Sequence, residues 1–197
     1  GETIYLCGGD TESGPTNRCW SLDLSGKGGD GFHWREETPL PGPPRVFALS
    51  AAQDDGREPQ FFVFSGRRPF PGGADLLTDA WSYSPSSRVW KRRAELPFCV
   101  MAGAAAPVGL HHIFTIGGDQ GDLFRKLEYD WPSAIKEAET SGDLAAAESL
   151  RAEKLALLTD HPGFSREILS YHTVTDPWTV AGRIPDSIDS PVCTTAV

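Results

Sequence analysis

Two arginine positions stand beside predicted strands and carry side chains able to recognise a ligand. Arg45 comes just before one strand-like run, and Arg67 and Arg68 directly follow another. A guanidinium group pairs with a carboxylate through two parallel hydrogen bonds, so an anionic ligand would suit these residues. Two plainer interpretations stay open, namely solvated loop charges and ion pairs with Asp10 or Asp119.

The signatures of several other enzyme classes are missing from the sequence. It has no G-x-S-x-G elbow, no P-loop, and no G-x-G-x-x-G between a strand and a helix. The cysteines at 7, 19, 99 and 193 form no C-x-x-C pair and lie near no histidine cluster, which disfavours a zinc site. Three of them lie in strand-like runs, where cysteine packs as a small apolar group, so we expect buried free thiols. We predict no metal and no cofactor.

Composition narrows the range of partners and of fold classes. Among 197 residues, 18 are Lys or Arg and 27 are Asp or Glu, which gives a formal net charge of −9 and disfavours nucleic acid as a partner. No run approaches 18 apolar residues, so we expect no membrane span. Gly1 and Glu2 lead directly into a strand-like run, so we expect no signal peptide in this chain. With 21 Gly and 16 Pro, the composition favours many short strands.

One pattern recurs three times along the chain. Each copy begins with a short apolar run that ends in small residues, continues through a polar loop to a second strand-like run with serine near its centre, and later reaches a tryptophan. The small pairs and tryptophans are Gly8-Gly9 with Trp34, Ser65-Gly66 with Trp90, and Gly117-Gly118 with Trp178. Four short strands per copy predict a blade of a β-propeller, with a β-sandwich as the alternative.

The small pairs, the serine-containing runs and the later tryptophans resemble kelch repeats, although Ser65 departs from the glycine pattern. The resemblance implies an all-β kelch β-propeller of about three four-stranded blades, half of a probable six-bladed ring. The predicted blades span 4–40, 45–96 and 98–184, and the final strand, 191–197, belongs to the next blade. Because propellers have about four to eight blades, we expect a longer chain or a second copy to supply the missing ones.

The third repeat is longer than the others by about 35 residues, and this helical insertion occupies about 125–160. We predict a helix over Leu144–Leu158 with Asp143 as its N-cap, and a shorter helix over Ser133–Thr140. Blade topology puts the insertion on the same face as the polar loops 10–18 and 67–78. It can therefore form a lid or wall for a central pocket, or a decoration that packs on a neighbour.

The kelch resemblance also implies roles for charged residues on that face. Kelch proteins often present arginine toward the central channel at the two places that Arg45 and Arg67 occupy. The substrate-binding candidates that follow are Arg45, Arg67, Arg68, Arg166, Asp10 and Asp119.

The segment 161–171 (HPGFSREILSY) and the last residues, 191–197 (PVCTTAV), resemble the N-acetylneuraminate epimerases, or sialic acid mutarotases, and most closely a cyclically permuted branch of that family. The resemblance implies exchange between the α and β anomers of N-acetylneuraminate. It also implies a small anionic sugar (sialic acid) as partner, and a periplasmic or secreted location.

Anomer exchange requires a group that removes one proton and returns another, which a carboxylate or a histidine can do. Family members are thought to use a glutamate in or near the insertion, but Pro162 stands where that glutamate is expected. The resemblance leaves Glu128, Glu167 and His161 as catalytic candidates. Structural interpretations stay open for each: an ion pair at a strand start for Glu167, a solvated carboxylate for Glu128, and a helix stop for His161.

Two functions therefore follow from the sequence. One is a mutarotase-like kelch propeller acting on N-acetylneuraminate, and the other is a non-catalytic kelch module that binds a protein or glycan. Fold alone does not separate them, because function depends on the site.

Overall fold

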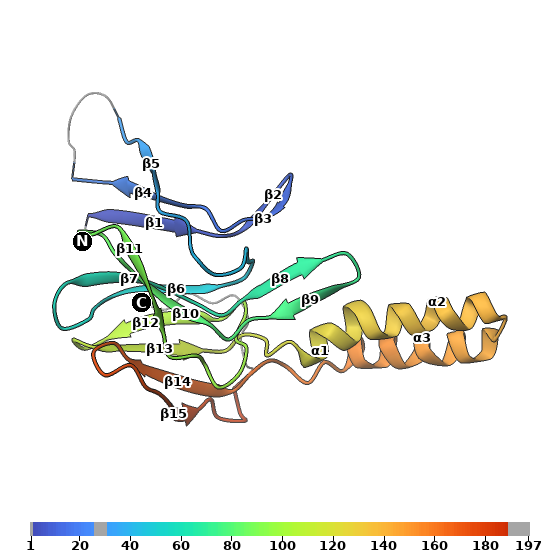
Figure 1. The fold of residues 1–197 in the computed structure, drawn as a ribbon. Coiled ribbons are helices and arrows are strands. Elements are labelled where there is room, and N and C mark those ends of the chain that lie inside the picture. The colour runs from blue at the N-terminus through green and yellow to red at the C-terminus, as the bar shows by residue number, and fades with distance from the viewer. Residues whose placement is uncertain (1, 26–30, 189–197) are drawn as a thin grey trace.

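The three repeats form three antiparallel sheets that stand side by side (Figure 1). The structure is a computed structural model, and it describes residues 2–25 and 31–188. Blade 1 has the order β1 (Thr3–Cys7), β4 (Cys19–Asp23), β5 (Trp34–Glu37). Blade 2 consists of β6 (Leu49–Asp54), β7 (Pro59–Phe64), β10 (Ala80–Ser84) and β11 (Val89–Arg93). Blade 3 consists of β12 (Ala104–Val108), β13 (His112–Ile116), β14 (Glu167–His172) and β15 (Trp178–Arg183).

The predicted kelch propeller architecture, with three blades and a helical insertion in the third, is confirmed. Blade 1 has three rather than four strands among the described residues. The predicted strand at 191–197 lies outside the described residues. In addition, two loops that the sequence analysis left without structure contain short hairpins, β2 (Asp10–Thr11) with β3 (Gly14–Pro15) and β8 (Arg67–Phe70) with β9 (Gly73–Leu76).

Apolar side chains fill the two spaces between the blades. Successive residues of a strand point to opposite faces, so β7 sends Phe61 and Val63 toward blade 1 and Phe62 and Phe64 toward blade 3. The repeated tryptophans reinforce both interfaces: the indole N–H of Trp90 donates to the Thr38 carbonyl (2.8 Å), and that of Trp178 donates to the Ala94 carbonyl (2.9 Å). Each tryptophan thus joins its own blade to the preceding one.

The small-residue pairs mark the place where each second strand leaves its blade. At Gly66, φ is +92°, and a Cβ atom would lie 2.7 Å from the Val46 carbonyl oxygen. Gly118 repeats this arrangement, with φ +81° and 2.8 Å to the Met101 carbonyl oxygen. Glycine is therefore required by both conformation and space. Ser65, the departure from the pattern, also has a positive φ (56°), and its buried hydroxyl accepts the Val100 N–H (2.7 Å).

The expectation of free thiols is wrong for two of the cysteines. Cys7 and Cys19 face each other across the β1–β4 ladder and form a disulfide. Sequence position alone separates the two cysteines by 12 residues, and only the antiparallel pairing of β1 with β4 places their side chains opposite each other. Cys99 is a buried free thiol, and its burial raises the pKa of the thiol group. Cys193 lies outside the described residues.

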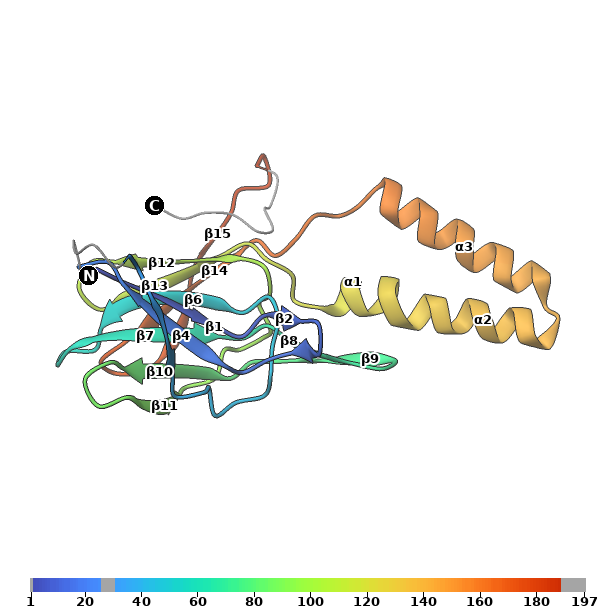
Figure 2. The ribbon, with the colours of Figure 1, turned by 90° about the horizontal axis from the view of Figure 1, so that it is seen from above.

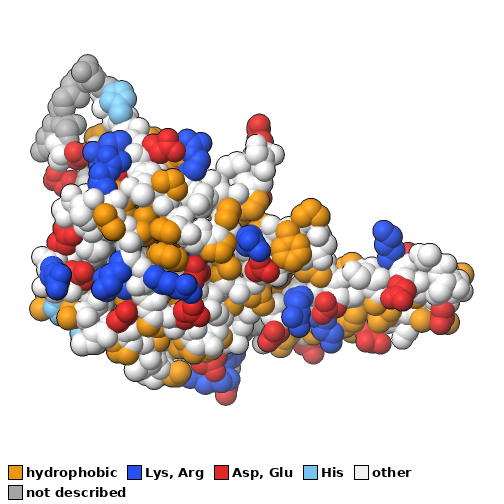
Figure 3. Space-filling view, in the orientation of Figure 1, with side chains coloured by type: hydrophobic (Ala, Val, Ile, Leu, Met, Phe, Trp, Pro, Cys, Tyr) orange, Lys and Arg blue, Asp and Glu red, His pale blue; other side chains and the backbone are white. Residues whose placement is uncertain are grey.

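The insertion consists of α1 (Asp122–Arg125), a π-helical segment η1 (Lys126–Asp130), α2 (Trp131–Ser141) and α3 (Leu144–Thr159). Asp143 caps α3 as predicted, accepting the Ala146 N–H (3.0 Å). Figures 1 and 2 show α2 and α3 side by side, extending away from the blades rather than across them. Figure 3 shows apolar side chains along this helical pair. No helix in the described ranges is long and apolar enough to cross a membrane.

A buried carboxylate joins blades 1 and 2. Glu37, whose side chain is 2% exposed, accepts hydrogen bonds from Ser21 and Tyr83 (both 2.6 Å) and forms ion pairs with Arg35 (2.6 Å) and Arg88 (3.0 Å). Burial acts to raise the pKa of Glu37, but the hydrogen bonds from Ser21, Tyr83 and Arg35 outweigh it and lower the pKa to about 2.

This arrangement makes stability depend on pH in a defined direction. The pKa of Glu37 is about 2 in the folded chain against 4.5 without its partners, so its contribution is complete above pH 4.5 and is lost as the pH falls toward 2. The shift corresponds to about 3 kcal/mol. In the unmodified chain the free energy of unfolding falls between pH 6 and pH 2, and we expect this fall to be about 3 kcal/mol smaller in Glu37→Gln. Urea titrations followed by tryptophan fluorescence measure it. Glu36→Gln, at the exposed neighbour paired with Arg18, serves as the control; an unchanged pH dependence in Glu37→Gln would contradict the assignment.

Candidate functional site

The connections that carry most of the predicted site residues gather at one end of the sheets (Figure 1). The β8–β9 hairpin follows β7, the second strand of blade 2, and the helical insertion follows β13, the second strand of blade 3. The β2–β3 hairpin follows β1, which is the equivalent strand of blade 1. The helix α1 links two of these connections. Gly121 at its start packs against Leu76 of β9, and Phe124 lies over the Arg67 guanidinium (3.8 Å to the ring centroid).

A cavity of about 350 Å³ lies at the base of the insertion. Its walls come from the start of the insertion, its end, and the first part of β14. Three residues of the predicted site line it: Asp119, Arg166 and Glu167. The other polar or charged side chains of the lining are Gln120, Asp122, Ser165 and Arg183. The cavity therefore brings together part of the predicted set.

Glu167 is the best-placed carboxylate of this cavity. Its Oε2 accepts a hydrogen bond from the Gln120 amide (3.1 Å) and one from the Ser165 hydroxyl (3.4 Å). Its Oε1 lies 3.9 Å from an Arg183 guanidinium nitrogen, across the β14–β15 ladder. The side chain remains 36% exposed, so the carboxylate is oriented by neighbours and still open to a ligand.

Arg166, by contrast, has little capacity left for a ligand. Its Nη1 donates to the carbonyl oxygens of Pro185 and Ile188, both at 2.7 Å, and its Nε lies 3.7 Å from an Asp186 carboxylate oxygen. The side chain is 19% exposed. Arg166 therefore holds the segment after β15 against the cavity wall, which is a positioning role. Asp119 likewise accepts the Gly121 N–H (2.6 Å) and shapes the entry into α1.

Arg67 has the opposite environment. Its guanidinium lies between the rings of Phe47 (4.8 Å) and Phe124 (3.8 Å). Within the described residues it makes no hydrogen bond or ion pair from its side chain, and its buried Nε has no partner. The contacts with the two rings use none of the guanidinium's hydrogen-bond donors. An anion would satisfy those donors.

Arg45 is completely buried and its donors are used within the protein. Nη1 and Nη2 bind the two Asp79 carboxylate oxygens (2.7 and 2.6 Å), Nη1 also donates to the Ser65 carbonyl, and Nε donates to the Pro43 carbonyl. The partner is Asp79, and neither Asp10 nor Asp119. Burial acts to raise the pKa of Asp79, but hydrogen bonds from Arg45 and Trp81 outweigh it and lower the pKa.

Six predicted residues lie outside the lining of this cavity: Arg45 and Arg67, described above, and the four that follow. Arg68 is exposed and paired with Asp75, and Asp10 accepts the N–H of the adjacent Thr11 (3.2 Å). Glu128 is exposed on η1. His161 accepts the Gly163 N–H (3.0 Å) and contacts Phe164 (5.0 Å between ring centroids) just after α3.

Sequence reasoning missed Gln120, Ser165 and Arg183. Gln120 had a detectable signal, because it follows the third small-residue pair by two positions, where Arg68 follows the second. Arg183 becomes a neighbour of Glu167 only through the strand register, which the sequence does not state. In the described ranges, no group of three or more His, Cys, Asp or Glu is arranged to hold a metal ion.

Comparison with known proteins gives two kinds of match. Two proteins named N-acetylneuraminate epimerase, from Haemophilus influenzae strains PittEE and 86-028NP, are each 28% identical over 195 residues. The resemblance to the N-acetylneuraminate epimerases is confirmed. Each match covers 95% of this chain but 46% of the relative, so the chain spans about half the length of these epimerases.

A solved structure titled "Structure of YjhT" superimposes with a TM-score of 0.68. It is 21% identical in sequence, and the match covers 94% of this chain and 49% of that one, which supports the shared fold. No family model matches the chain.

The buried Arg45–Asp79 pair predicts a large effect on stability. Removing one partner of a buried ion pair leaves a charge without compensation and costs about 3–5 kcal/mol. We expect Asp79→Ala to lower the free energy of unfolding by that amount in urea titrations. Asp75→Ala removes the partner of exposed Arg68 and should change it by about 1 kcal/mol or less. Equal effects of the two substitutions would contradict a structural role for Arg45.

Proposed function

We propose that this chain forms part of a mutarotase-like kelch propeller that interconverts the anomers of N-acetylneuraminate. The observation that carries the proposal is the Arg67 guanidinium, which is held between two rings with no partner for its donors among the described residues. The substrate is an anionic sugar, and its carboxylate matches such a group. The similarity to N-acetylneuraminate epimerases supports the same substrate.

Anomer exchange divides into proton transfers that one carboxyl group can perform. A base removes the proton of the anomeric hydroxyl, the bond between the anomeric carbon and the ring oxygen breaks, and the ring oxygen receives a proton. Rotation in the open keto form and reversal of these steps give the other anomer. We assign the proton transfers to Glu167, because its carboxylate is held by Gln120 and Ser165 and remains accessible from the cavity.

The helix α1 links the two proposed functions of the site. Leu123 lines the cavity that contains Glu167, and the next residue, Phe124, covers Arg67. Arg67 itself does not line that cavity, so in this proposal the sugar carboxylate binds Arg67 beside α1 while the anomeric centre reaches Glu167; fixing the sugar in this way lowers the barrier of the reaction. The blade bounds 4–40, 45–96 and 98–184, and completion of the ring by a longer chain or a second copy, belong to the same proposal.

Arg67→Ala tests recognition of the carboxylate. We expect binding of N-acetylneuraminate to weaken by about tenfold to a hundredfold, because charge-assisted hydrogen bonds are lost. Saturation-transfer NMR titrations measure the affinity. Arg92→Ala is the matched control, because Arg92 also lies near an aromatic ring, that of Trp81, but is exposed and paired with Glu95. An affinity unchanged in Arg67→Ala would contradict the assignment.

Glu167→Gln tests the proton transfers. The amide keeps the shape of the side chain but cannot take a proton, so we expect the enhancement of α–β exchange to fall by about a hundredfold or more while binding persists. Exchange spectroscopy between the anomeric resonances measures this rate against the spontaneous one. A loss in Glu128→Gln instead would assign the base to the insertion. Saturable binding by the unmodified chain without faster exchange would favour the non-catalytic binding module.

A further inference from the structure

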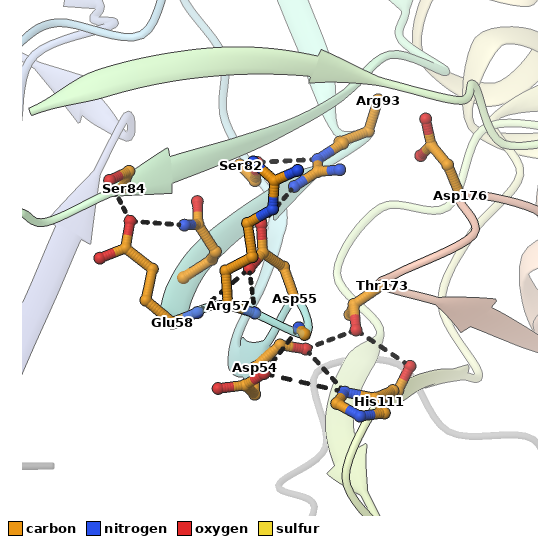
Figure 4. Close-up of polar contacts among 12 residues, drawn as sticks. Asp54, Asp55, Arg57, Glu58, Ser82, Ser84, Arg93, His111, Thr173 and Asp176 are labelled. Atoms are coloured by element: carbon orange, nitrogen blue, oxygen red, sulfur yellow. Dashed lines mark hydrogen bonds and ion pairs between the residues drawn. The ribbon is translucent and has the colours of Figure 1, made fainter. Parts of the chain in front are cut away.

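A second polar cavity lies between blades 2 and 3, at the end of the sheets opposite the helical insertion. Its volume is about 520 Å³, and its walls are the β6–β7 turn and one face of β10 and β11 (Figure 4). Val174, from the β14–β15 turn, closes the side toward blade 3. Two adjacent blades build this cavity, and both are described in full, so it does not depend on further blades.

The carboxylates of the cavity wall are already engaged. Arg93, with a side chain 5% exposed, donates to the Ser82 hydroxyl (2.8 Å) and lies 3.3 Å from an Asp55 carboxylate oxygen. Glu58 accepts hydrogen bonds from the Gln60 amide (3.1 Å) and the Ser84 hydroxyl. Arg93 neutralises Asp55, and the hydrogen bonds from Gln60 and Ser84 hold the Glu58 carboxylate against the wall.

Two cations of the same wall have no such partner. The side chains of Arg57 and Lys91 line the cavity, and within residues 2–25 and 31–188 neither makes a hydrogen bond or an ion pair. Figure 4 shows the Arg57 side chain extending toward Ser82 and Arg93. Lys91 stands directly opposite Ser82 in the β10–β11 ladder. With Arg93, Asp55 and Glu58 counted, the wall carries one positive charge in excess, although the chain as a whole has a net charge of −9.

We propose that this cavity binds the oxyanion group of a small hydroxylated molecule. Arg57 and Lys91 carry the neutralising charge and donate the hydrogen bonds to the anion oxygens. Ser87 and Gln60, which also line the cavity, offer hydrogen bonds to the hydroxyl groups of the same ligand. The site is separate from the Glu167 cavity, and it stands whether or not the chain exchanges anomers.

Titration of the 197-residue chain with sodium sulfate, followed by ¹H–¹⁵N NMR, tests the proposal. Sodium chloride at matched ionic strength is the reference. We expect saturable sulfate-specific shifts in the β6–β7 turn and in β10 and β11. The double variant Arg57→Ala/Lys91→Ala should weaken sulfate binding by about tenfold or more. Arg92→Ala should leave it within about twofold, because Arg92 neighbours Lys91 on β11 but does not line the cavity.

Three results would overturn the proposal: shifts equal to those caused by chloride, sulfate binding unchanged in the double variant, or sulfate shifts confined to the Glu167 cavity. Glucose 6-phosphate and gluconate then distinguish the two sources of the oxyanion. Tighter binding of the first than of sulfate assigns a phosphate ester, and tighter binding of the second assigns a sugar acid. Either assignment also requires that Arg57→Ala/Lys91→Ala weaken binding of that ligand by about tenfold or more.

Discussion

The blades and the candidate site depend on one constraint, the close approach of two backbone segments just after the second strand of a blade. Gly66 and Gly118 leave no room for a side chain against the Val46 and Met101 carbonyl groups. This contact allows two short backbone bridges, Val46 with Arg67 and Met101 with Asp119. In these two copies, backbone hydrogen bonds fix the residue after the small pair at one end of the sheets. Its side chain is free to differ, and the three copies have Asp10, Arg67 and Asp119 there.

The sequence predicted the features that depend on local patterns. Repeated small pairs, tryptophans and alternating strands required only residues within one blade, and the α3 helix with its Asp143 cap required only its own composition. Contacts between blades were not accessible in this way. Tyr83 meets Glu37 across 46 positions, so that carboxylate finds this partner only after blades 1 and 2 have packed. Arg45 meets Asp79 across 34 positions within the second predicted blade, so this pair forms only once the strands of that blade are in place.

The same limit explains the mixed outcome at the candidate site. The repeat indicates at which end of the sheets a residue lies, and three residues predicted for the same end, Asp119, Arg166 and Glu167, do line one cavity. The repeat does not indicate how many hydrogen-bond donors of a side chain are already used by the protein. Arg166 looked available for a ligand, yet the Pro185 and Ile188 carbonyls occupy it. Those partners follow β15, and their positions depend on how the chain turns after that strand.

Arg45 and Arg67 show how one residue type can be made structural or left for a ligand. Arg45 is neutralised by Asp79, and its buried donors are satisfied by oxygen atoms. Arg67 instead has aromatic rings on its guanidinium, contacts worth about 0.5–2 kcal/mol each, while its buried Nε lacks an acceptor at a cost of about 1–3 kcal/mol. The ring contacts roughly offset that cost, so the protein can hold a charged group in one orientation without consuming its hydrogen bonds. An anion that binds the guanidinium gains charge-assisted hydrogen bonds at little further cost in side-chain freedom.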